Sequence, residues 1–189
     1  MTSTTISERP AEATETSSTT TMPGDVVLRP ARTTDLPRIV ELNNASTPAV
    51  PHTGESEMAE LVDSSTLTLV AAEPETDEPV GFVVAFDGDA TFEAENFDWF
   101  AERDYSHYYV DRIVLGEGAR DRGVGRKFYD EIFDEARRNG RKEVTCEVNI
   151  EPMNAGSLRF HGRLGFEDRG EQLIHEGTVT VRKLAAPVR

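Results

Sequence analysis

A glycine turn flanked by arginines is the stretch of this sequence whose residue types and spacing point most directly to chemistry. The turn runs over residues 120–125, Arg-Asp-Arg-Gly-Val-Gly, between a β-branched run at 108–115 and an amphipathic helix pattern. Glycine lets the backbone approach a ligand closely, and the first N–H groups of a helix have no intrahelical partners. The helix dipole and the charges of Arg120, Arg122 and Arg126 add positive potential. The turn therefore predicts a binding site for a phosphate-bearing ligand.

Two common phosphate-binding patterns do not fit this turn. A Rossmann fingerprint needs Gly-x-Gly-x-x-Gly after the first strand of its unit, with an acidic residue about 20 positions later. The nearest candidate, residues 116–121, lacks the third glycine and places a carboxylate where the phosphate would lie. A nucleotide P-loop needs Gly-Lys-Ser/Thr, which is absent from the sequence. The identity of the ligand must therefore come from the rest of the chain.

The segments around the turn predict a βαβ unit. A strand at 107–115 precedes the turn, an amphipathic helix at 126–139 follows it, and a second strand covers 143–150. Two strands joined by a helix are expected to be parallel, with a right-handed crossover. A helix at 152–164 and a hairpin at 166–174 and 178–184 complete the chain.

The residues before this unit predict shorter elements. A strand at 26–31, helices at 33–44 and 55–62, and a hairpin at 65–72 and 79–86 are expected. An aromatic cluster among carboxylates at 92–103 is a short helix or a lid, and simple packing is favoured over a substrate-facing role. Residues 1–24 are rich in Thr, Ser, Glu and Pro, which predicts a disordered tail. The folded domain is expected over residues 25–186.

Composition limits the function classes. The chain has 189 residues and a formal net charge of −15, from 35 Asp+Glu against 20 Lys+Arg, which argues against binding nucleic acid or an anionic membrane. A single cysteine, Cys146, excludes an internal disulfide, and no metal-binding spacing is found among the histidines. With no apolar run of the ~20 residues that span a bilayer and no signal-like segment, a cytoplasmic location is expected.

A second motif lies about 30 residues beyond the turn. Together, Arg-x-x-Gly-x-Gly at 120–125 and the pattern Asn-x-x-Ser-x-x-Phe-His-x-x-x-Gly-Phe at 154–166 resemble the GNAT acyltransferase superfamily. The resemblance extends in outline over residues 26–184. The segments 109–114 and 145–149 also resemble a poorly characterised subgroup of predicted GNAT enzymes. The resemblance implies an α/β fold: a single domain with a mixed six- to seven-stranded sheet, a central parallel βαβ unit and flanking helices.

The resemblance also implies a cofactor, acetyl-CoA or another acyl-CoA, used as co-substrate without a metal. The pyrophosphate would lie on the glycine turn, and the pantetheine arm would pair with the backbone of the preceding strand as an added strand would. In the family the two parallel strands splay apart, and the thioester lies between them. The residues implied in cofactor binding are Ile113, Val114, Leu115, Arg120, Arg122, Gly123, Val124, Gly125, Arg126, Asn154 and Ser157.

The implied reaction is acetyl transfer to a primary amine of a small molecule or peptide, by direct attack in a ternary complex. It needs a base for the ammonium, a donor for the oxyanion and a proton for the thiolate. The family usually has tyrosine where this chain has His161. His161 is either a general acid or thiol contact, or a histidine that only packs beneath the cofactor. A backbone N–H near Ile113 would serve the oxyanion.

Asp111 is the leading candidate for the base and Glu147 on the neighbouring strand is the second. Strand alternation is expected to place Tyr109, Asp111 and Ile113 on one face and Arg112 on the other. A structural salt bridge of Asp111 is the alternative, and a water chain could replace a single base. Cys146 is expected to be a buried strand residue.

A second function remains open at this point. Because the family's tyrosine is missing, the sequence is also compatible with a non-catalytic module that binds acyl-CoA as a sensor or interaction domain. Dimers are common in the superfamily, so a homodimer is a further expectation.

Overall fold

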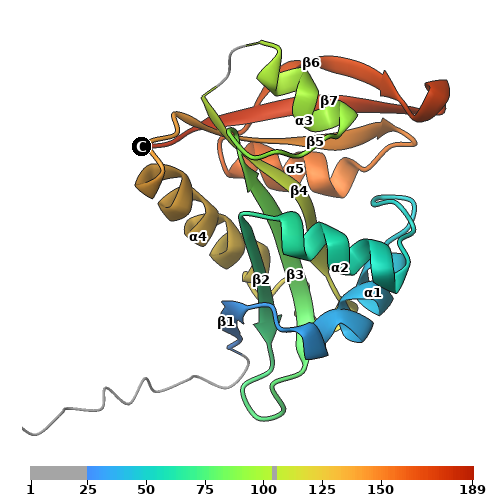
Figure 1. Cartoon of the computed structure of the whole chain (residues 1–189), viewed down its shortest axis with the longest axis vertical. Helices are drawn as coiled ribbons and strands as arrows, with labels where there is room; N and C mark the ends of the chain where they lie inside the picture. The colour runs from blue at the N-terminus through green and yellow to red at the C-terminus, as the bar shows by residue number, and fades with distance from the viewer. Residues whose placement is uncertain (1–24, 104–105) are drawn as a thin grey trace, which may run out of the picture.

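One mixed sheet of seven strands, in the order β1-β2-β3-β4-β5-β7-β6, forms the centre of the molecule (Figure 1). The computed structural model describes residues 25–103 and 106–189, so the predicted disordered tail lies outside the described residues. The predicted mixed sheet is confirmed. The strands are β1 (Val27–Pro30), β2 (Leu67–Ala72), β3 (Pro79–Asp87), β4 (His107–Leu115), β5 (Glu143–Glu151), β6 (Glu167–Ile174) and β7 (Val179–Pro187).

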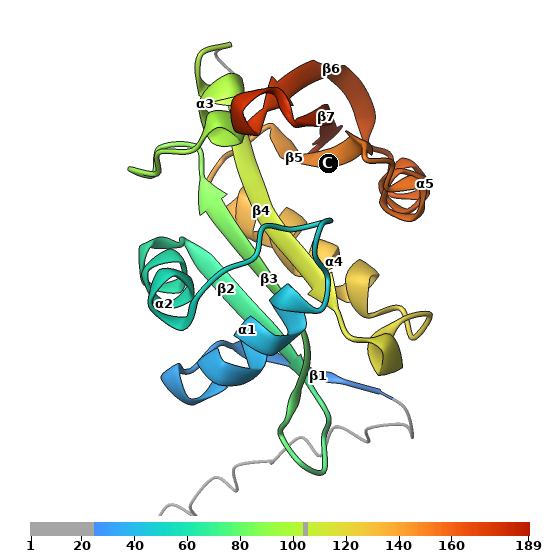
Figure 2. The same cartoon turned by 90° about the vertical axis from the view of Figure 1, so that its right-hand side faces the viewer.

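Helices cover both faces of this sheet. The helices are α1 (Leu36–Asn44), α2 (Glu55–Ser64), α3 (Glu95–Ala101), α4 (Val124–Arg138) and α5 (Ala155–Arg163). Helix α4 lies on one side of the sheet, and α1 and α2 lie on the other (Figures 1 and 2). Each side has its own apolar core: Phe128 and Ile132 of α4 pack in one, whereas Ile39 of α1 and Met58 of α2 pack in the other. Among the described helices, none is long and apolar enough to cross a membrane.

The predicted βαβ unit is present, and its two strands separate halfway along. Strands β4 and β5 are parallel and paired only from His107–Glu143 to Val110–Cys146. Beyond these residues β4 continues to Leu115 beside β3, and β5 continues to Glu151 beside β7. The strands therefore diverge, as the resemblance implied, and the space between their outer halves is open to a ligand.

A β-bulge at Asp111 changes which side chains share a face of β4. In the pairing with β3, Ala85 lies opposite Val110 and Val84 lies opposite Arg112, which leaves Asp111 as the extra residue. A bulge shifts the alternation by one residue. Tyr109 accordingly packs in the core on the α1–α2 side, whereas Ile113 packs against the core on the α4 side. The prediction that Tyr109, Asp111 and Ile113 share one face, opposite Arg112, was wrong for this reason.

Two other expectations are refined by the structure. The last helix begins at Ala155 rather than 152, because the Asn154 side chain accepts a hydrogen bond from the Ser157 backbone N–H at 3.1 Å and caps it. In the 92–103 segment, Phe97, Trp99 and Phe100 are buried, which agrees with the packing interpretation. Phe92 stacks on Phe86 with ring centroids 3.7 Å apart.

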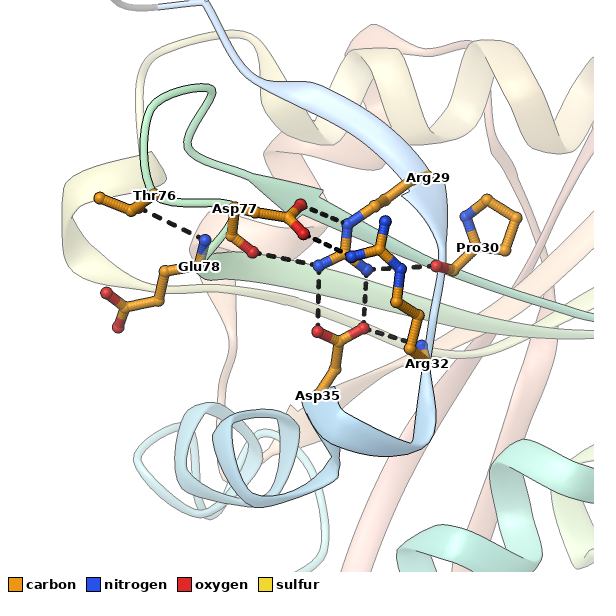
Figure 3. Close-up of polar contacts among 7 residues, drawn as sticks. All are labelled: Arg29, Pro30, Arg32, Asp35, Thr76, Asp77 and Glu78. Carbon is orange, nitrogen blue, oxygen red and sulfur yellow. Dashed lines mark hydrogen bonds and ion pairs between the residues drawn. The ribbon is translucent and has the colours of Figure 1, made fainter.

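An arginine-centred network ties β1 to the start of α1 and to the β2–β3 turn. The Arg29 guanidinium donates to both carboxylate oxygens of Asp35, at 2.7 and 3.0 Å, and its Nε donates to Asp77 at 2.6 Å (Figure 3). The Arg32 backbone N–H also donates to Asp35, at 2.8 Å. Asp35 is only 5% exposed, and these hydrogen bonds from Arg29 lower the pKa of its carboxyl. The network is a structural clasp in which the charges balance one another.

Candidate active site

A cleft of about 1960 Å³ occupies the space between the diverging halves of β4 and β5. Its walls come from the outer half of β4, the turn before α4, β5 and α5. The loop between α1 and α2, the segment leading into α3, and the β6–β7 hairpin close the remaining side. Segments far apart in the sequence thus meet at the point where the sheet opens.

The glycine turn forms one end of this cleft. Gly123 is the N-cap of α4 and has a φ of 75°, a left-handed conformation that favours glycine. A Cβ on Gly125 would lie 2.9 Å from Cζ of Phe160, so the close packing of α4 on α5 requires glycine there. Both glycines and Val124 line the cleft as predicted. The unpaired N–H groups at the helix start therefore belong to the cleft wall.

Three cleft arginines carry charges that the described protein does not neutralise. Arg120, Arg126 and Arg163 line the cleft and form no hydrogen bond or ion pair with another described residue. Arg122 behaves differently, because its guanidinium donates to both oxygens of Glu73, at 2.5 and 3.1 Å, and it is not part of the lining. The side chain of Arg122 fixes the turn to the end of β2, and the cofactor contact expected for Arg122 stays a prediction. Sequence reasoning missed Arg163.

The strand backbone predicted to bind the pantetheine arm also lies in the cleft. Ile113, Val114 and Leu115 line it, and in the described structure β5 pairs with none of them. Asn154 and Ser157 lie on the opposite wall, where they form the cap of α5. A strand edge faces the cap of a helix across the opening.

His161 lies at the base of the cleft and is 2% exposed. Its Nδ1 is 2.8 Å from the Ser157 carbonyl oxygen, which only accepts, so Nδ1 carries the proton. Its Nε2 is 2.7 Å from the Tyr129 hydroxyl and accepts a hydrogen bond from it. Burial lowers the pKa of His161 and favours this neutral form. Both ring nitrogens are thus engaged inside the protein, and the Tyr129 hydroxyl stands beside the imidazole in the cleft wall.

Glu147 is a half-buried residue of β5 that lines the cleft. The Tyr109 hydroxyl donates to its two oxygens at 3.1 and 2.9 Å. No ion pair within 4.0 Å reaches it from the described residues. Burial raises the pKa of Glu147 to about 7, although the charge of Lys183 opposes that rise.

Lys183 lies directly across the β5–β7 pairing from Glu147 and is fully buried. Its ammonium donates to the Asn96 side chain at the start of α3, and it lies 5.7 Å from the ring centre of Phe100. Burial lowers the pKa of Lys183 to about 8. Strand β7 thus places the Lys183 ammonium near the Glu147 carboxyl group, although the two groups form no ion pair within 4.0 Å.

Asp111, at the bulge, also lines the cleft but is paired. Nε of Arg112 donates to its carboxylate at 3.0 Å. Burial raises the pKa of Asp111, and the neighbouring Arg112 charge opposes the rise. The salt bridge that the sequence left as an alternative is present. Cys146 is a buried strand residue, as expected, and burial raises the pKa of its thiol.

Several residues of the site carried weak signals in the sequence. Tyr109 and Tyr129 read as core positions of a strand and a helix. Lys183 had a recognisable signal, because it interrupts the apolar alternation of the last strand. Among the described residues, no group of three or more His, Cys, Asp or Glu is arranged to hold a metal ion.

The fold and this cleft agree with a family assignment. Residues 36–166, more than half of the chain, match the Acetyltransferase (GNAT) family. The chain therefore belongs to the GNAT acetyltransferase family.

Comparison with individual proteins gives sequence matches over about a third of the chain and structural matches over most of it. The L-methionine sulfoximine/L-methionine sulfone acetyltransferase of Salmonella typhimurium is 32% identical over 69 residues, which span 36% of this chain and 39% of that protein. The yncA acetyltransferase structure from Salmonella typhimurium, solved with acetyl-CoA, has a TM-score of 0.66 and 19% identity, and the match covers 87% of this chain and 95% of that one. Ard1 from Thermoplasma volcanium has a TM-score of 0.68 and 16% identity, with 87% and 98% covered.

Proposed function

We propose that this protein is an acetyl-CoA-dependent N-acetyltransferase that acts on a primary amine of a small molecule or peptide. The observation that carries the proposal is the cleft where β4 and β5 diverge. Arginines without a described partner lie at one end of it, and the half-buried carboxyl group of Glu147, without an ion-pair partner among the described residues, lies inside it. The amine nitrogen attacks the thioester carbon directly, the C–S bond breaks, and an amide and free CoA are the products. The names of the Salmonella relative and the acetyl-CoA-bound structure support this reading.

The cofactor's phosphates are proposed to bind at the start of α4. Arg120, Arg126 and the N–H groups around Gly123 to Gly125 supply positive charge and donors. Arg163 on α5 adds a cation across the cleft. The backbone of Ile113 to Leu115 would pair with the pantetheine arm, and an N–H near Ile113 would stabilise the oxyanion. In an acidic protein, three unneutralised arginines in one cleft favour a polyanionic ligand.

Glu147 is proposed as the general base in preference to Asp111. A base works best when its pKa lies near the working pH and its carboxylate is not already paired with a cation. Glu147 meets both conditions, whereas Asp111 is bonded to Arg112. Glu147 takes the proton from the ammonium, directly or through one water, and Asp111 holds the bulge and Arg112 in place.

The sulfur of CoA is proposed to meet the Tyr129–His161 pair. His161 occupies the family's tyrosine position, but its single N–H points to the Ser157 carbonyl oxygen. The hydroxyl in the wall is that of Tyr129 from α4, held by Nε2 of His161. We propose that this hydroxyl turns its hydrogen from Nε2 of His161 to the sulfur as the C–S bond breaks, so that the departing thiolate accepts a hydrogen bond, and that His161 positions the hydroxyl before that step.

The test is a panel of primary amines with acetyl-CoA, in which release of free CoA is followed with a thiol reagent. CoA binding is measured separately by calorimetry, so that binding and turnover are independent readouts. Acetylation of at least one amine is expected, with loss of turnover in His161→Ala and Tyr129→Phe. CoA binding without release for any amine would contradict the proposal and favour a sensor module. Unchanged turnover in His161→Ala would overturn its assignment alone. The cytoplasmic location stays a prediction, to be checked by fractionation.

A further inference from the structure

Arg112 lines the cleft, and its guanidinium group is held by three hydrogen-bond partners. Its Nε donates to Asp111 at 3.0 Å, and its Nη1 donates to the Asn43 side chain at 3.0 Å and to the Thr53 hydroxyl at 2.6 Å. These partners come from the bulge of β4, from α1 and from the loop after α1. The side chain is 10% exposed. A guanidinium anchored in this way loses little conformational freedom when it binds a ligand.

One edge of this guanidinium remains without a partner. Nη2 of Arg112 forms no hydrogen bond with any described residue, although Arg112 lines the cleft. Holding the α1–α2 loop requires only the bonds of Nη1, and the contact with Asp111 requires only Nε. The Nη2 donors therefore remain available in a largely desolvated position, where a charge-assisted hydrogen bond is strong.

The charges around Arg112 define what can bind there. Apart from Arg120, Arg126 and Arg163 at the cofactor end, Arg112 is the only arginine or lysine among the described residues that line the cleft. Glu147 lies on the neighbouring strand and, in the proposed reaction, takes the proton of the incoming amine. A cation receptor and an anion receptor thus stand on adjacent strands where β4 and β5 begin to diverge.

We propose that the acceptor carries a carboxylate on the carbon next to its amine, as in a free α-amino acid, and that Arg112 binds this carboxylate through Nη2. The inference rests on the proposed acetyltransferase function and narrows its substrate class. The ammonium of the acceptor faces Glu147 while its carboxylate faces Arg112, so one small zwitterion engages both groups. Arg112 is then the residue that determines specificity, and it takes no proton in the reaction.

Apolar side chains line the adjoining part of the cleft and offer a place for the rest of the acceptor. Val50 and Leu61 come from the α1–α2 region, and Phe92 comes from the segment before α3. Exposed carboxylates of Glu57, Glu93 and Glu95 border the same side. Probes with an apolar and with a basic side chain therefore test the same carboxylate contact in two surroundings.

The experiment compares three acceptors that differ only at the carboxylate: leucine, leucinamide and 3-methylbutylamine, with lysine, lysinamide and 1,5-diaminopentane as a second set. For the wild-type protein, kcat/KM with acetyl-CoA is expected to be about 100-fold higher for the amino acid than for the amine that lacks the carboxylate. In Arg112→Gln this preference should collapse to within a few-fold, while an unchanged affinity for CoA, measured by calorimetry, reports an intact fold. Arg112→Lys, which keeps the charge but loses the planar fork, should recover only part of the preference.

The outcomes separate this inference from the proposed function. Equal use of amino acid and amine, or a preference for the amide, would overturn the inference and leave the acetyltransferase standing. If no acceptor is acetylated, calorimetry of leucine and lysine against the CoA-loaded protein decides. Binding that Arg112→Gln abolishes would support the carboxylate site without the reaction. No binding of either amino acid would overturn it.

Discussion

Two carboxyl groups, the buried Asp35 and the half-buried Glu147, have opposite environments in this molecule. Asp35 receives two hydrogen bonds from Arg29, and that pairing lowers its pKa. Among the described side chains, Glu147 receives a hydrogen bond from the Tyr109 hydroxyl and has no cation within ion-pair distance, and burial raises its pKa to about 7. The first arrangement holds the carboxylate permanently ionised and is structural. The second leaves a group that gains and loses a proton near neutral pH, which suits a base.

The arginines also fall into two groups, those paired with carboxylates and those without a described partner. Arg29 is surrounded by the carboxylates of Asp35 and Asp77, whereas Arg120 and Arg126 have no described partner although the chain carries a net charge of −15. In a protein with so many carboxylates, an arginine left unpaired in a cleft indicates a ligand site. Charged side chains that are paired with one another thus stabilise the fold, whereas arginines without a described partner lie in the candidate site.

Glu147→Gln should have the largest effect. We expect kcat to fall by about 10³-fold, because the amide cannot accept the proton. In the wild-type protein the rate should rise with pH through about 7, and the variant should lose that rise. The measurement is a pH–rate profile with a good acceptor, and Glu60→Gln, at an exposed position on α2, is the matched control. A variant that keeps the profile would show that Glu147 is not the base.

The same substitution should increase stability in alkaline solution. The folded pKa of Glu147 is raised, so its contribution to stability is present in full at low pH and is lost as the pH rises through about 7. Glutamine has no charge to bury, so at pH 8 the variant should exceed the wild type by on the order of 2 kcal/mol in free energy of unfolding. Urea titrations at pH 5 and pH 8 test this difference.

Arg29→Met should act on stability and leave the cleft unchanged. Removing one partner of a buried pair leaves Asp35 with an uncompensated charge, so the free energy of unfolding should fall by about 3 kcal/mol. The folded pKa of Asp35 is lowered, so the stability it contributes is present above its ordinary pKa and is lost as the solution becomes acidic. The variant should lose this acid-sensitive part. Arg137→Met, whose partner Asp134 is exposed, is the control and should cost under about 1 kcal/mol. A weakened affinity for CoA in Arg29→Met would contradict the assignment of Arg29 to structure alone.

Replacing both Arg120 and Arg126 by alanine should give the converse result. Dissociation constants for CoA are expected to rise about 30-fold and to lose much of their salt dependence, because two cations facing phosphate are removed. The melting temperature should stay within a degree or two of the wild-type value. Arg122→Ala is the matched control, since it removes an arginine of the same turn that is bonded to Glu73. A larger loss of affinity in Arg122→Ala than in the double variant would reverse the assignment.

The order of the elements, the phosphate-binding turn and the family could be predicted from local sequence patterns. The glycine turn between a β-branched strand and an amphipathic helix predicted a phosphate-binding site, and two spaced motifs predicted the family. What failed depended on contacts between distant segments. The bulge at Asp111 is set by pairing with β3, and no pattern within β4 announces it. The bond of Arg122 to Glu73 joins residues 49 positions apart, and no pattern in the turn predicts it. We propose Glu147 ahead of Asp111 as the base, the reverse of the order expected from the sequence, because Arg112 is paired with Asp111.

Strand β4 pairs with β3 along most of its length, whereas it pairs with β5 along only its first half. It pairs with β3 on both sides of the bulge, over residues 108–110 and 112–115, but with β5 only over His107–Val110. Amide protons held between two strands leave only when the sheet opens, whereas those facing the unpaired side exchange with water from the folded state. One continuous strand therefore carries two exchange regimes, with Asp111 at the boundary. A ligand backbone laid along the outer half would move its amides into the slow class.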